Sequence, residues 1–292
     1  MSRPESSSDF LILPLADLLM RKLAHMREKG EVPVIGQDIT FMAFALAHLD
    51  ESKAQMAQDL WVLYELNNKR SGWFVELGAG DGELISNTWL LETVYGWRGV
   101  LAEPNVVFHK TLRRRKAFLC KDCVSSASRQ TVCFNHTPDP HFSTIDTYSE
   151  ADLHAELRRP GIRGEVRTIS LMDLLAISRS PPLIDFLSLD TEGSELEILE
   201  SLDFSCYKFG AITVEHNYGA NRERIHGLLT RHGYRRKFAH LTHFDDWYVN
   251  DEALAMLRHV EPHSSGPHSE WIWERSLAGL KNIFRIRRHL NP

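Results

Sequence analysis

A glycine-rich turn between an apolar run and a helical pattern is the feature that most constrains how this chain folds. Residues 73–75 form an apolar run that predicts the end of a buried strand. The acid Glu76 follows, and then glycine recurs at alternate positions, namely Gly78, Gly80 and Gly82. Glycine has no Cβ, so such a turn can bring backbone against a ligand and adopt positive φ. A dinucleotide fingerprint would need glycine where Glu83 stands, so the spacing argues against pyrophosphate and favours a ligand with an ammonium group and hydroxyls.

Composition excludes several classes of protein. The chain has 292 residues, of which 43% are hydrophobic and 25% charged, as in ordinary globular proteins that bury a core. A net charge of −5 argues against broad nucleic-acid binding, so no nucleic-acid partner is expected. Four cysteines without a secretory signal pattern indicate a reducing compartment, and we expect a cytoplasmic protein. The apolar segment 10–20 contains Pro14 and Asp17 and is too short to span a membrane, so no transmembrane segment is expected.

The order of apolar patterns predicts an α/β fold behind a helical segment. Helical spacing occurs over residues 11–29, 39–48 and 52–66, which predicts an N-terminal helical cap over residues 1–70. Apolar runs and helical patterns then alternate, which predicts a parallel sheet within a domain spanning residues 71–255. The strands are expected at residues 73–76, 99–103, 118–123, 131–135, 184–190, 211–215 and 245–249, with a helix at 222–232. The polar stretch 136–167 is expected to be a long, functional connection.

The C-terminal part, residues 256–292, is predicted to hold a linker and a basic amphipathic helix. The linker covers residues 261–269 and the helical pattern residues 271–290. A helix of this kind is typical of a membrane surface or a partner protein, but docking on its own domain is the more common outcome. A homodimer formed through the N-terminal helices or this helix is a further possibility.

Acidic residues after the second and third strands predict a nucleoside site. Glu103 and Pro104 end the second strand, where a carboxylate can accept hydrogen bonds from both ribose hydroxyls. Asp122 and Cys123 follow the third strand, where an adenine amino group would lie. Together with Glu76, these residues fit a nucleoside that lies across three strand ends.

Residues 185–195 add a longer motif, Asp-Phe-Leu-Ser-Leu-Asp-Thr-Glu-Gly-Ser-Glu. This segment, with the glycine turn and the segments 102–105, 213–217, 233–234 and 245–248, resembles the FkbM family of methyltransferases over residues 70 to 250. The resemblance implies a class I, Rossmann-like methyltransferase sheet with helices on both faces, and O-methylation that uses S-adenosylmethionine. The acceptors of that family are often sugars or hydroxyls of secondary metabolites. The cofactor-binding residues expected here are Glu76, Gly78, Ala79, Gly80, Gly82, Glu103, Pro104, Asp122, Cys123 and Asp190.

Polar residues at the ends of the fourth and fifth strands are candidates for the chemistry. Asp190 ends one strand, and Glu215, His216 and Asn217 end the next. Methyl transfer to a hydroxyl needs the loss of a proton or a cation that polarises the oxygen. Asp190, Glu215, His216 and Asn217 could bind Mg²⁺ or another divalent cation, in positions similar to those of catechol O-methyltransferase-type enzymes. The alternative is a metal-free site in which His216 is the general base, with Asp190 and Glu215 as further catalytic residues.

The sequence therefore predicts an S-adenosylmethionine-dependent O-methyltransferase that acts on a small hydroxylated acceptor. Two alternatives are an NAD(P)-dependent oxidoreductase and a non-catalytic protein that binds S-adenosylmethionine. Cys120 and Cys123, with Cys133 and His136, have the spacing of a zinc site. Residues three apart in a strand point to opposite faces, so buried free thiols are expected instead.

Overall fold

The computed structural model of this chain describes residues 37–258. The expected helix at residues 11–29, the linker and the basic C-terminal helix lie outside these described residues. No helix among the described residues is long and apolar enough to cross a membrane.

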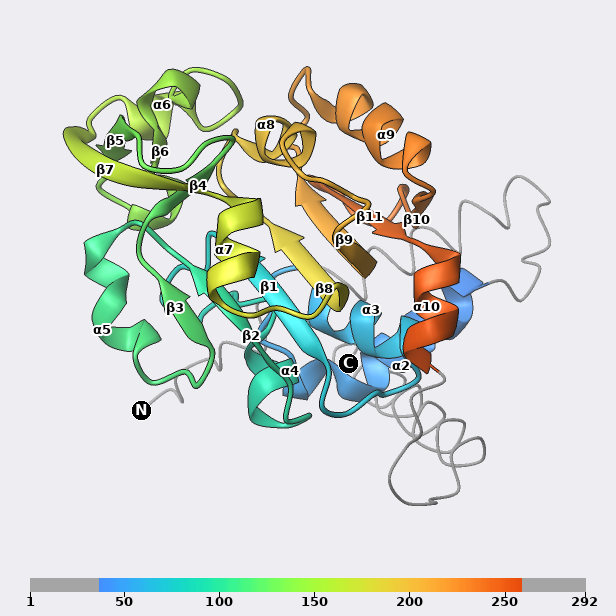
Figure 1. Cartoon of the computed structure of the whole chain (residues 1–292). Coiled ribbons are helices and arrows are strands. Elements are labelled where there is room, and N and C mark those ends of the chain that lie inside the picture. The colour runs from blue at the N-terminus through green and yellow to red at the C-terminus, as the bar shows by residue number, and fades with distance from the viewer. Residues whose placement is uncertain (1–36, 259–292) are drawn as a thin grey trace, which may run out of the picture.

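A seven-stranded sheet forms the centre of residues 37–258, in the order β10-β11-β9-β8-β1-β2-β3 (Figure 1). β1 pairs in parallel with β2 and β8, and β8 pairs in parallel with β9. β11 and β10 are antiparallel additions at one edge. This topology confirms the Rossmann-like class I sheet expected from the sequence. The strands are Trp73–Leu77 (β1), Arg98–Ala102 (β2), Phe118–Cys120 (β3), Leu183–Leu189 (β8), Lys208–Glu215 (β9), Arg235–Lys237 (β10) and Asp245–Val249 (β11).

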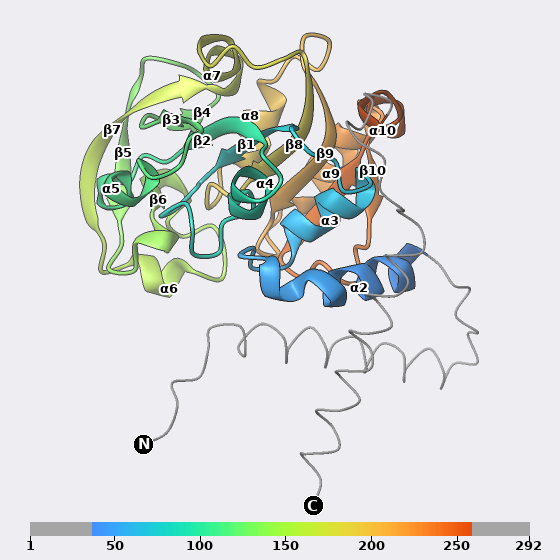
Figure 2. The ribbon, with the colours of Figure 1, turned by 90° about the horizontal axis from the view of Figure 1, so that it is seen from below.

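Helices cover both faces of this sheet (Figure 2). α7, α8 and α9 pack against one face through leucine and isoleucine side chains, and α2, α3, α4, α5 and α10 pack against the other. Because parallel strands are then buried on both sides, most of their residues are apolar, as in β8. The bounds are Gln37–His48 (α2), Gln58–Glu65 (α3), Trp89–Thr93 (α4), His109–Leu112 (α5), Leu171–Ile177 (α7), Glu195–Glu200 (α8), Arg222–Arg231 (α9) and Asp251–Arg258 (α10).

α2 and α3 pack on the antiparallel edge of the sheet. Trp61 of α3 stacks on Trp247 of β11 with ring centroids 4.8 Å apart, and Phe41 of α2 stacks on Phe238 at 5.1 Å. The helix expected at residues 39–48 is confirmed by α2, but the one expected from residue 52 begins only at Gln58. A left-handed residue, Ala57 with φ +59°, precedes it and separates it from the chain before.

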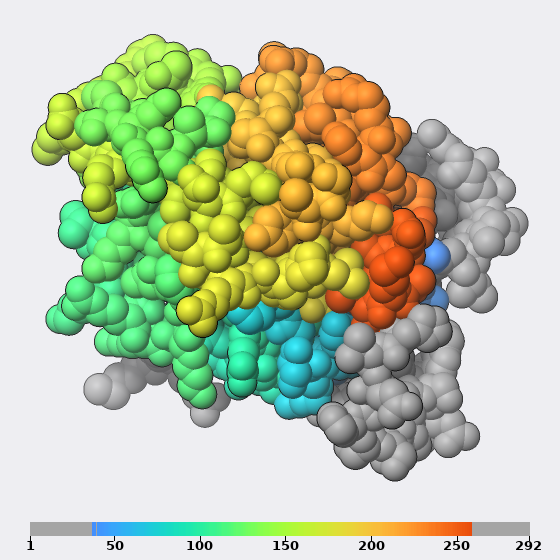
Figure 3. All heavy atoms as spheres, viewed as in Figure 1, coloured from blue at the N-terminus to red at the C-terminus, as the bar shows by residue number. Residues whose placement is uncertain are grey.

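A second, four-stranded sheet of order β4-β7-β5-β6 adjoins the carboxyl ends of β1 and β2 (Figure 1). In the space-filling view the surface of this sheet is contiguous with that of α8 and α9 (Figure 3). Its strands are Cys123–Ser125 (β4), Thr131–His136 (β5), Thr144–Ile145 (β6) and Ile162–Ser170 (β7), and the short helix α6 covers Ala155–Arg158.

This second sheet corrects two predictions. The strand expected at residues 118–123 is broken, because β3 ends at Cys120 in the large sheet and β4 begins at Cys123 against β7. The connection expected at 136–167 contains β6, α6 and the start of β7. The first residues of β7 are largely exposed and charged, so they lack the apolar run that marks a buried strand.

Candidate active site

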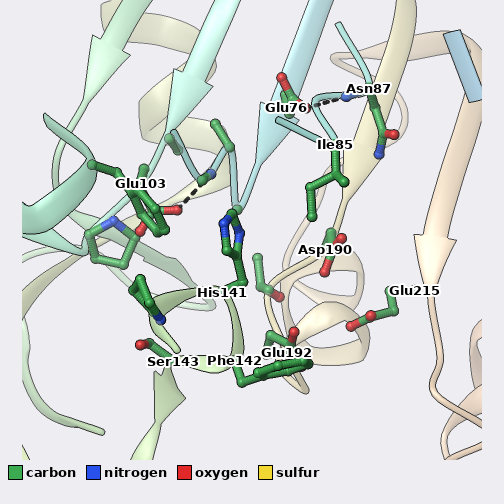
Figure 4. Close-up of a pocket in the computed structure, with 18 of the residues that line it drawn as sticks. Glu76, Ile85, Asn87, Glu103, His141, Phe142, Ser143, Asp190, Glu192 and Glu215 are labelled. Carbon is green, nitrogen blue, oxygen red and sulfur yellow. Dashed lines mark hydrogen bonds between the residues drawn. The ribbon is translucent and has the colours of Figure 1, made fainter. Parts of the chain in front are cut away.

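One cavity of about 240 Å³ lies at the carboxyl ends of β1, β2, β8 and β9. The glycine turn and the strand ends form one side of it, and the second sheet and its turns form the other (Figure 4). In sheets of this kind ligands bind outside the carboxyl ends of the strands. The predicted residues that line it are Glu76, Gly78, Ala79, Gly80, Glu103, Pro104, Cys123, Asp190, Glu215 and Asn217.

The glycine turn is packed directly against the loop after β8. Gly78 has φ +79°, and a Cβ built on it would lie 1.7 Å from the carbonyl oxygen of Asp190. Only glycine fits such an approach of two backbones. The predicted residue Gly82 does not line the cavity; it faces Leu112 and Arg115 on the other side of the turn.

Glu103 is buried at the cavity wall and is held by backbone. Its Oε2 accepts from the amide of Gly80 at 3.0 Å and its Oε1 from the amide of Asn105 at 2.7 Å. Burial raises the pKa of this carboxyl to about 7, although the two amides lower it. Each carboxylate oxygen keeps a lone pair, so Glu103 can accept from two vicinal hydroxyls.

Glu76 and Asn87 lie beside the start of the turn. The Glu76 carboxylate accepts from the amide of Asn87 at 2.7 Å and from the hydroxyls of Ser86 and Thr88. Burial raises the pKa of Glu76 despite these bonds. The Asn87 side chain donates to Ser188, and its buried Oδ1 has no partner among the described residues. An orphaned acceptor beside a carboxylate at the cavity wall suits a ligand ammonium group.

Asp122 does not reach the cavity. It pairs with Arg167 at 3.3 Å, and a third of its side chain (33%) is exposed. The break between β3 and β4 turns Asp122 outward and leaves the buried Cys123 on the cavity wall.

Three carboxylates converge on the opposite side of the cavity. Oxygens of Asp190, Glu192 and Glu215 lie within 4.8 Å of one another, and all three residues are visible in Figure 4. Burial, followed by repulsion from neighbouring acids, raises the pKa of Asp190 and of Glu215 well above the usual range. Glu192 is paired with Arg158, whereas Asp190 and Glu215 accept from no N–H or O–H group of the described residues other than each other.

His216 does not line this cavity. In this structure it therefore lies away from the place where the predicted general base or metal ligand would act. Its Nδ1 accepts from the amide of Tyr218 at 3.0 Å, and its buried Nε2 lies 3.8 Å from Asp246. Burial lowers the pKa of this imidazole. The left-handed backbone of Asn217, with φ +43°, separates the two side chains, so that Asn217 lines the cavity and His216 does not.

The second sheet and its turns supply further cavity residues. Pro140, His141, Phe142 and Ser143 come from one turn, and His154 precedes α6. The His141 ring lies 3.1 Å from the position of a Cβ on Gly80 and packs against Phe108. The concentration of histidine, aromatic and hydroxyl residues at 141–145 marks this turn in the sequence as a candidate for acceptor recognition, whereas no such signal marks His154.

The cysteine and histidine residues with zinc-like spacing do not converge. All four cysteines are free thiols; Cys120 and Cys123 are buried and Cys133 is exposed. The expectation of buried free thiols is therefore confirmed for Cys120 and Cys123. Among residues 37–258, the groups that could hold a metal by proximity include none of these cysteines.

Comparison with known families decides the identity. The model of the methyltransferase FkbM domain matches residues 76–236, which is more than half of the chain. The chain belongs to the FkbM methyltransferase family. The matching domain is a methyltransferase domain, and that family implies the use of S-adenosylmethionine.

Solved structures of low identity were also found. Methyltransferase FkbM from Methylobacillus flagellatus KT is 14% identical, with a TM-score of 0.37, over 71% of this chain. This chain spans 58% of the length of that protein. Precorrin-6y C5,15-methyltransferase from Geobacter metallireducens GS-15 is 14% identical, with a TM-score of 0.36, over 65% of this chain and 85% of that one. No curated protein sequence matches.

Proposed function

We propose that this FkbM-family protein transfers the methyl group of S-adenosylmethionine to a hydroxyl of a small acceptor, such as a sugar or a natural product. One observation carries the proposal. The glycine turn and Glu103, which suit a nucleoside, line the same cavity as the carboxylates of Asp190 and Glu215, which have no cationic partner among the described residues. A cofactor held by the first group would present its reactive end toward the second.

The residues at the glycine turn fit the cofactor. Glu103 would accept from the ribose hydroxyls, and the amide of Gly80 holds its carboxylate at the cavity wall. The ammonium group would lie near Glu76 and the orphaned Oδ1 of Asn87. Cys123 and Val124, both buried, offer an apolar surface for the adenine.

The acceptor would enter between the carboxylates and the second sheet. Phe134, Phe142 and Ser143 line that side, and they combine apolar rings with a hydroxyl. Such a wall suits a ring that carries hydroxyl groups. Acceptor-specific residues commonly lie on loops over a fixed core, as these do.

The carboxylates at the strand ends also fit a divalent cation. Asp190 and Glu215 would hold it, because each is a buried or cavity-lining carboxylate without a cationic partner in residues 37–258. Asn217 adds an amide oxygen at the same wall. Oxygen ligands of this kind favour Mg²⁺, Mn²⁺ or Ca²⁺, and a bound cation would lower the pKa of an acceptor hydroxyl.

Product analysis tests this function. The protein is incubated with S-adenosylmethionine carrying a deuterated methyl group and with methyl glycosides or catechol as probes. We expect a product with a new O-methyl group and stoichiometric S-adenosylhomocysteine. Asp190→Asn should keep cofactor affinity and lose turnover. Labelled methyl on nitrogen or sulfur acceptors alone would contradict O-methyl transfer.

A further inference from the structure

A second constellation of charged residues faces the same cavity from the side of the second sheet. His154 lines the cavity just before α6, and its ring packs against Phe142 with centroids 4.6 Å apart. Nδ1 of His154 lies 3.4 Å from Oε2 of Glu192. Nε2 makes no hydrogen bond within residues 37–258.

Buried ion pairs fix the Glu192 carboxylate behind this histidine. The Arg158 side chain is fully buried and donates to Oε2 of Glu192 and to both carboxylate oxygens of Asp152, at 2.7 and 3.0 Å. Asp152 also accepts from the amide of His154 at 2.8 Å. Asp152, His154 and Glu192 could hold a metal by proximity alone, but the Arg158 guanidinium already neutralises their carboxylates.

We propose that His154 is the general base of the methyl transfer, with Glu192 and Arg158 as its positioning residues. The inference rests on the proposed function. Glu192 accepts the Nδ1 proton, which leaves the lone pair on Nε2 free to take a proton. This carboxylate–imidazole arrangement orients a base and stabilises the imidazolium that forms.

The step balances as follows. The acceptor oxygen forms a bond to the methyl carbon of the sulfonium while the carbon–sulfur bond breaks. The electron pair of that bond goes to sulfur and gives the neutral thioether of S-adenosylhomocysteine. The hydroxyl proton goes to Nε2 of His154, and the resulting imidazolium lies beside the Glu192 carboxylate.

The charged groups around His154 act in opposite senses. The hydrogen bond and the charge of Glu192, together with Asp152, raise the pKa of His154, whereas burial and Arg158 lower it. The net direction is upward from 6.5. Glu192 thus makes the His154 imidazole a stronger base than an isolated histidine.

The other histidines near the site are placed differently. His141 lies against Gly80 and Phe108, beside the cofactor turn, and forms no ion pair in the described structure. His216 is turned away toward Asp246. His154 combines a place on the cavity wall with a carboxylate partner.

The kinetic test uses the full chain and the variants His154→Gln, Glu192→Gln and His136→Gln. His136 is a matched control, because it lies in β5 of the same sheet but not on the cavity. With methyl glycosides or catechol as acceptors, His154→Gln should lower kcat by about 10²–10⁴-fold. It should also abolish the rise of kcat with pH and leave the Kd of S-adenosylhomocysteine within about twofold of the wild type. His136→Gln should change none of these.

A spectroscopic arm needs no acceptor. Two-dimensional ¹H–¹⁵N spectra of the histidine rings, recorded with S-adenosylhomocysteine bound, should show His154 protonated on Nδ1 when neutral. Its pKa should lie above 6.5 and fall in Glu192→Gln. The opposite tautomer, or a pKa that ignores Glu192→Gln, would overturn the assignment even if no probe is methylated.

The two proposals fail separately. An active wild type with an unaltered His154→Gln variant refutes His154 as the base and leaves O-methyl transfer standing. A wild type that does not bind S-adenosylhomocysteine refutes the proposed function itself.

Discussion

Glu103 shows how one buried residue can link ligand affinity to pH. Burial raises the pKa of its carboxyl to about 7, so the charged and neutral forms are about equally populated at neutral pH. In the proposed cofactor site the ribose hydroxyls would donate to the carboxylate, so binding would favour the deprotonated form. The protonated carboxyl is a weaker hydrogen-bond acceptor, because one of its two oxygens carries a proton.

We therefore expect the affinity for S-adenosylhomocysteine to weaken below pH about 7, by up to about tenfold per pH unit. Calorimetry between about pH 8 and pH 6 measures this. Glu103→Gln should bind more weakly at high pH and show a flat profile. An equal slope in Glu103→Gln would assign the titration to another group.

The positions of single site residues were predictable where the residue lies at the end of a buried strand. Glu103 and Glu215 follow apolar runs, and the topology brings both strand ends to one cavity. The place of Asp122 was not predictable, since it depends on the break between β3 and β4. The place of His154 depends on a contact with Glu192, 38 positions away.

At the scale of elements, the glycine turn and the loop after β8 form one rigid contact. The built Cβ of Gly78 meets backbone, which cannot rotate away as a side chain can. Gly96 also has positive φ, at +71°, but nothing lies within 4 Å of its built Cβ. A substitution at Gly96 therefore tests the strain of a positive φ alone, whereas one at Gly78 tests that strain together with a steric clash.

Gly78→Ala should therefore unfold the protein or abolish cofactor binding. Gly96→Ala should cost only about 1–2 kcal/mol, the strain of a left-handed residue. Urea unfolding and calorimetry with S-adenosylhomocysteine measure both effects. A Gly78→Ala variant as stable and as tightly binding as Gly96→Ala would show that the two loops can separate.

Most strands of the large sheet were predictable, because strands buried on both faces are rich in apolar residues. β10 was not predicted, because its three residues are all basic. The expected strand at residues 245–249 coincides with β11, and its pairing with β9 follows from the fold. In the second sheet, the strand expected at residues 131–135 is β5, but β6 and β7 were not predicted. β7 holds Arg163, Glu165 and Arg167 on exposed positions, and its pairing with β5 shows no apolar run.

At the scale of the whole molecule, buried carboxyls make stability depend on pH. The pKa of Asp59 is raised to about 6 and those of Glu103 and Asp245 to about 7, each mainly by burial. Asp190 and Glu215 shift in the same direction. At pH values between the pKa of these carboxyls in the unfolded chain and their raised pKa in the folded protein, the native state binds more protons than the unfolded state. The free energy of unfolding therefore falls as pH rises through this range.

We expect the metal-free protein to unfold at lower urea concentration at about pH 8 than at about pH 6. The lowered pKa of His216 acts in the opposite direction, because this group alone would make stability rise with pH. If Asp190 and Glu215 hold a cation, Mn²⁺ should raise Tm more at the higher pH. A Tm that rises with pH without metal would contradict the sum of these shifts.

Glu215→Gln distinguishes cation binding from charge repulsion within the carboxylate cluster. Removing a charge from the cluster should raise the Tm of the metal-free protein, by about 2–4 °C for each kcal/mol gained. The same change should abolish the increment from Mn²⁺. An undiminished increment would place the cation elsewhere.

The most direct test of the account is calorimetry of S-adenosylhomocysteine and of NAD against the wild type, Glu103→Ala and Glu83→Ala. Glu83 is an exposed acid beside the same turn and outside the cavity, so it controls for the loss of charge. We predict that the wild type binds S-adenosylhomocysteine and not NAD, and that Glu103→Ala weakens binding by roughly 1.5–3 kcal/mol. Glu83→Ala should bind as the wild type does. Unchanged affinity in Glu103→Ala, or binding of NAD instead, would contradict the proposed cofactor site.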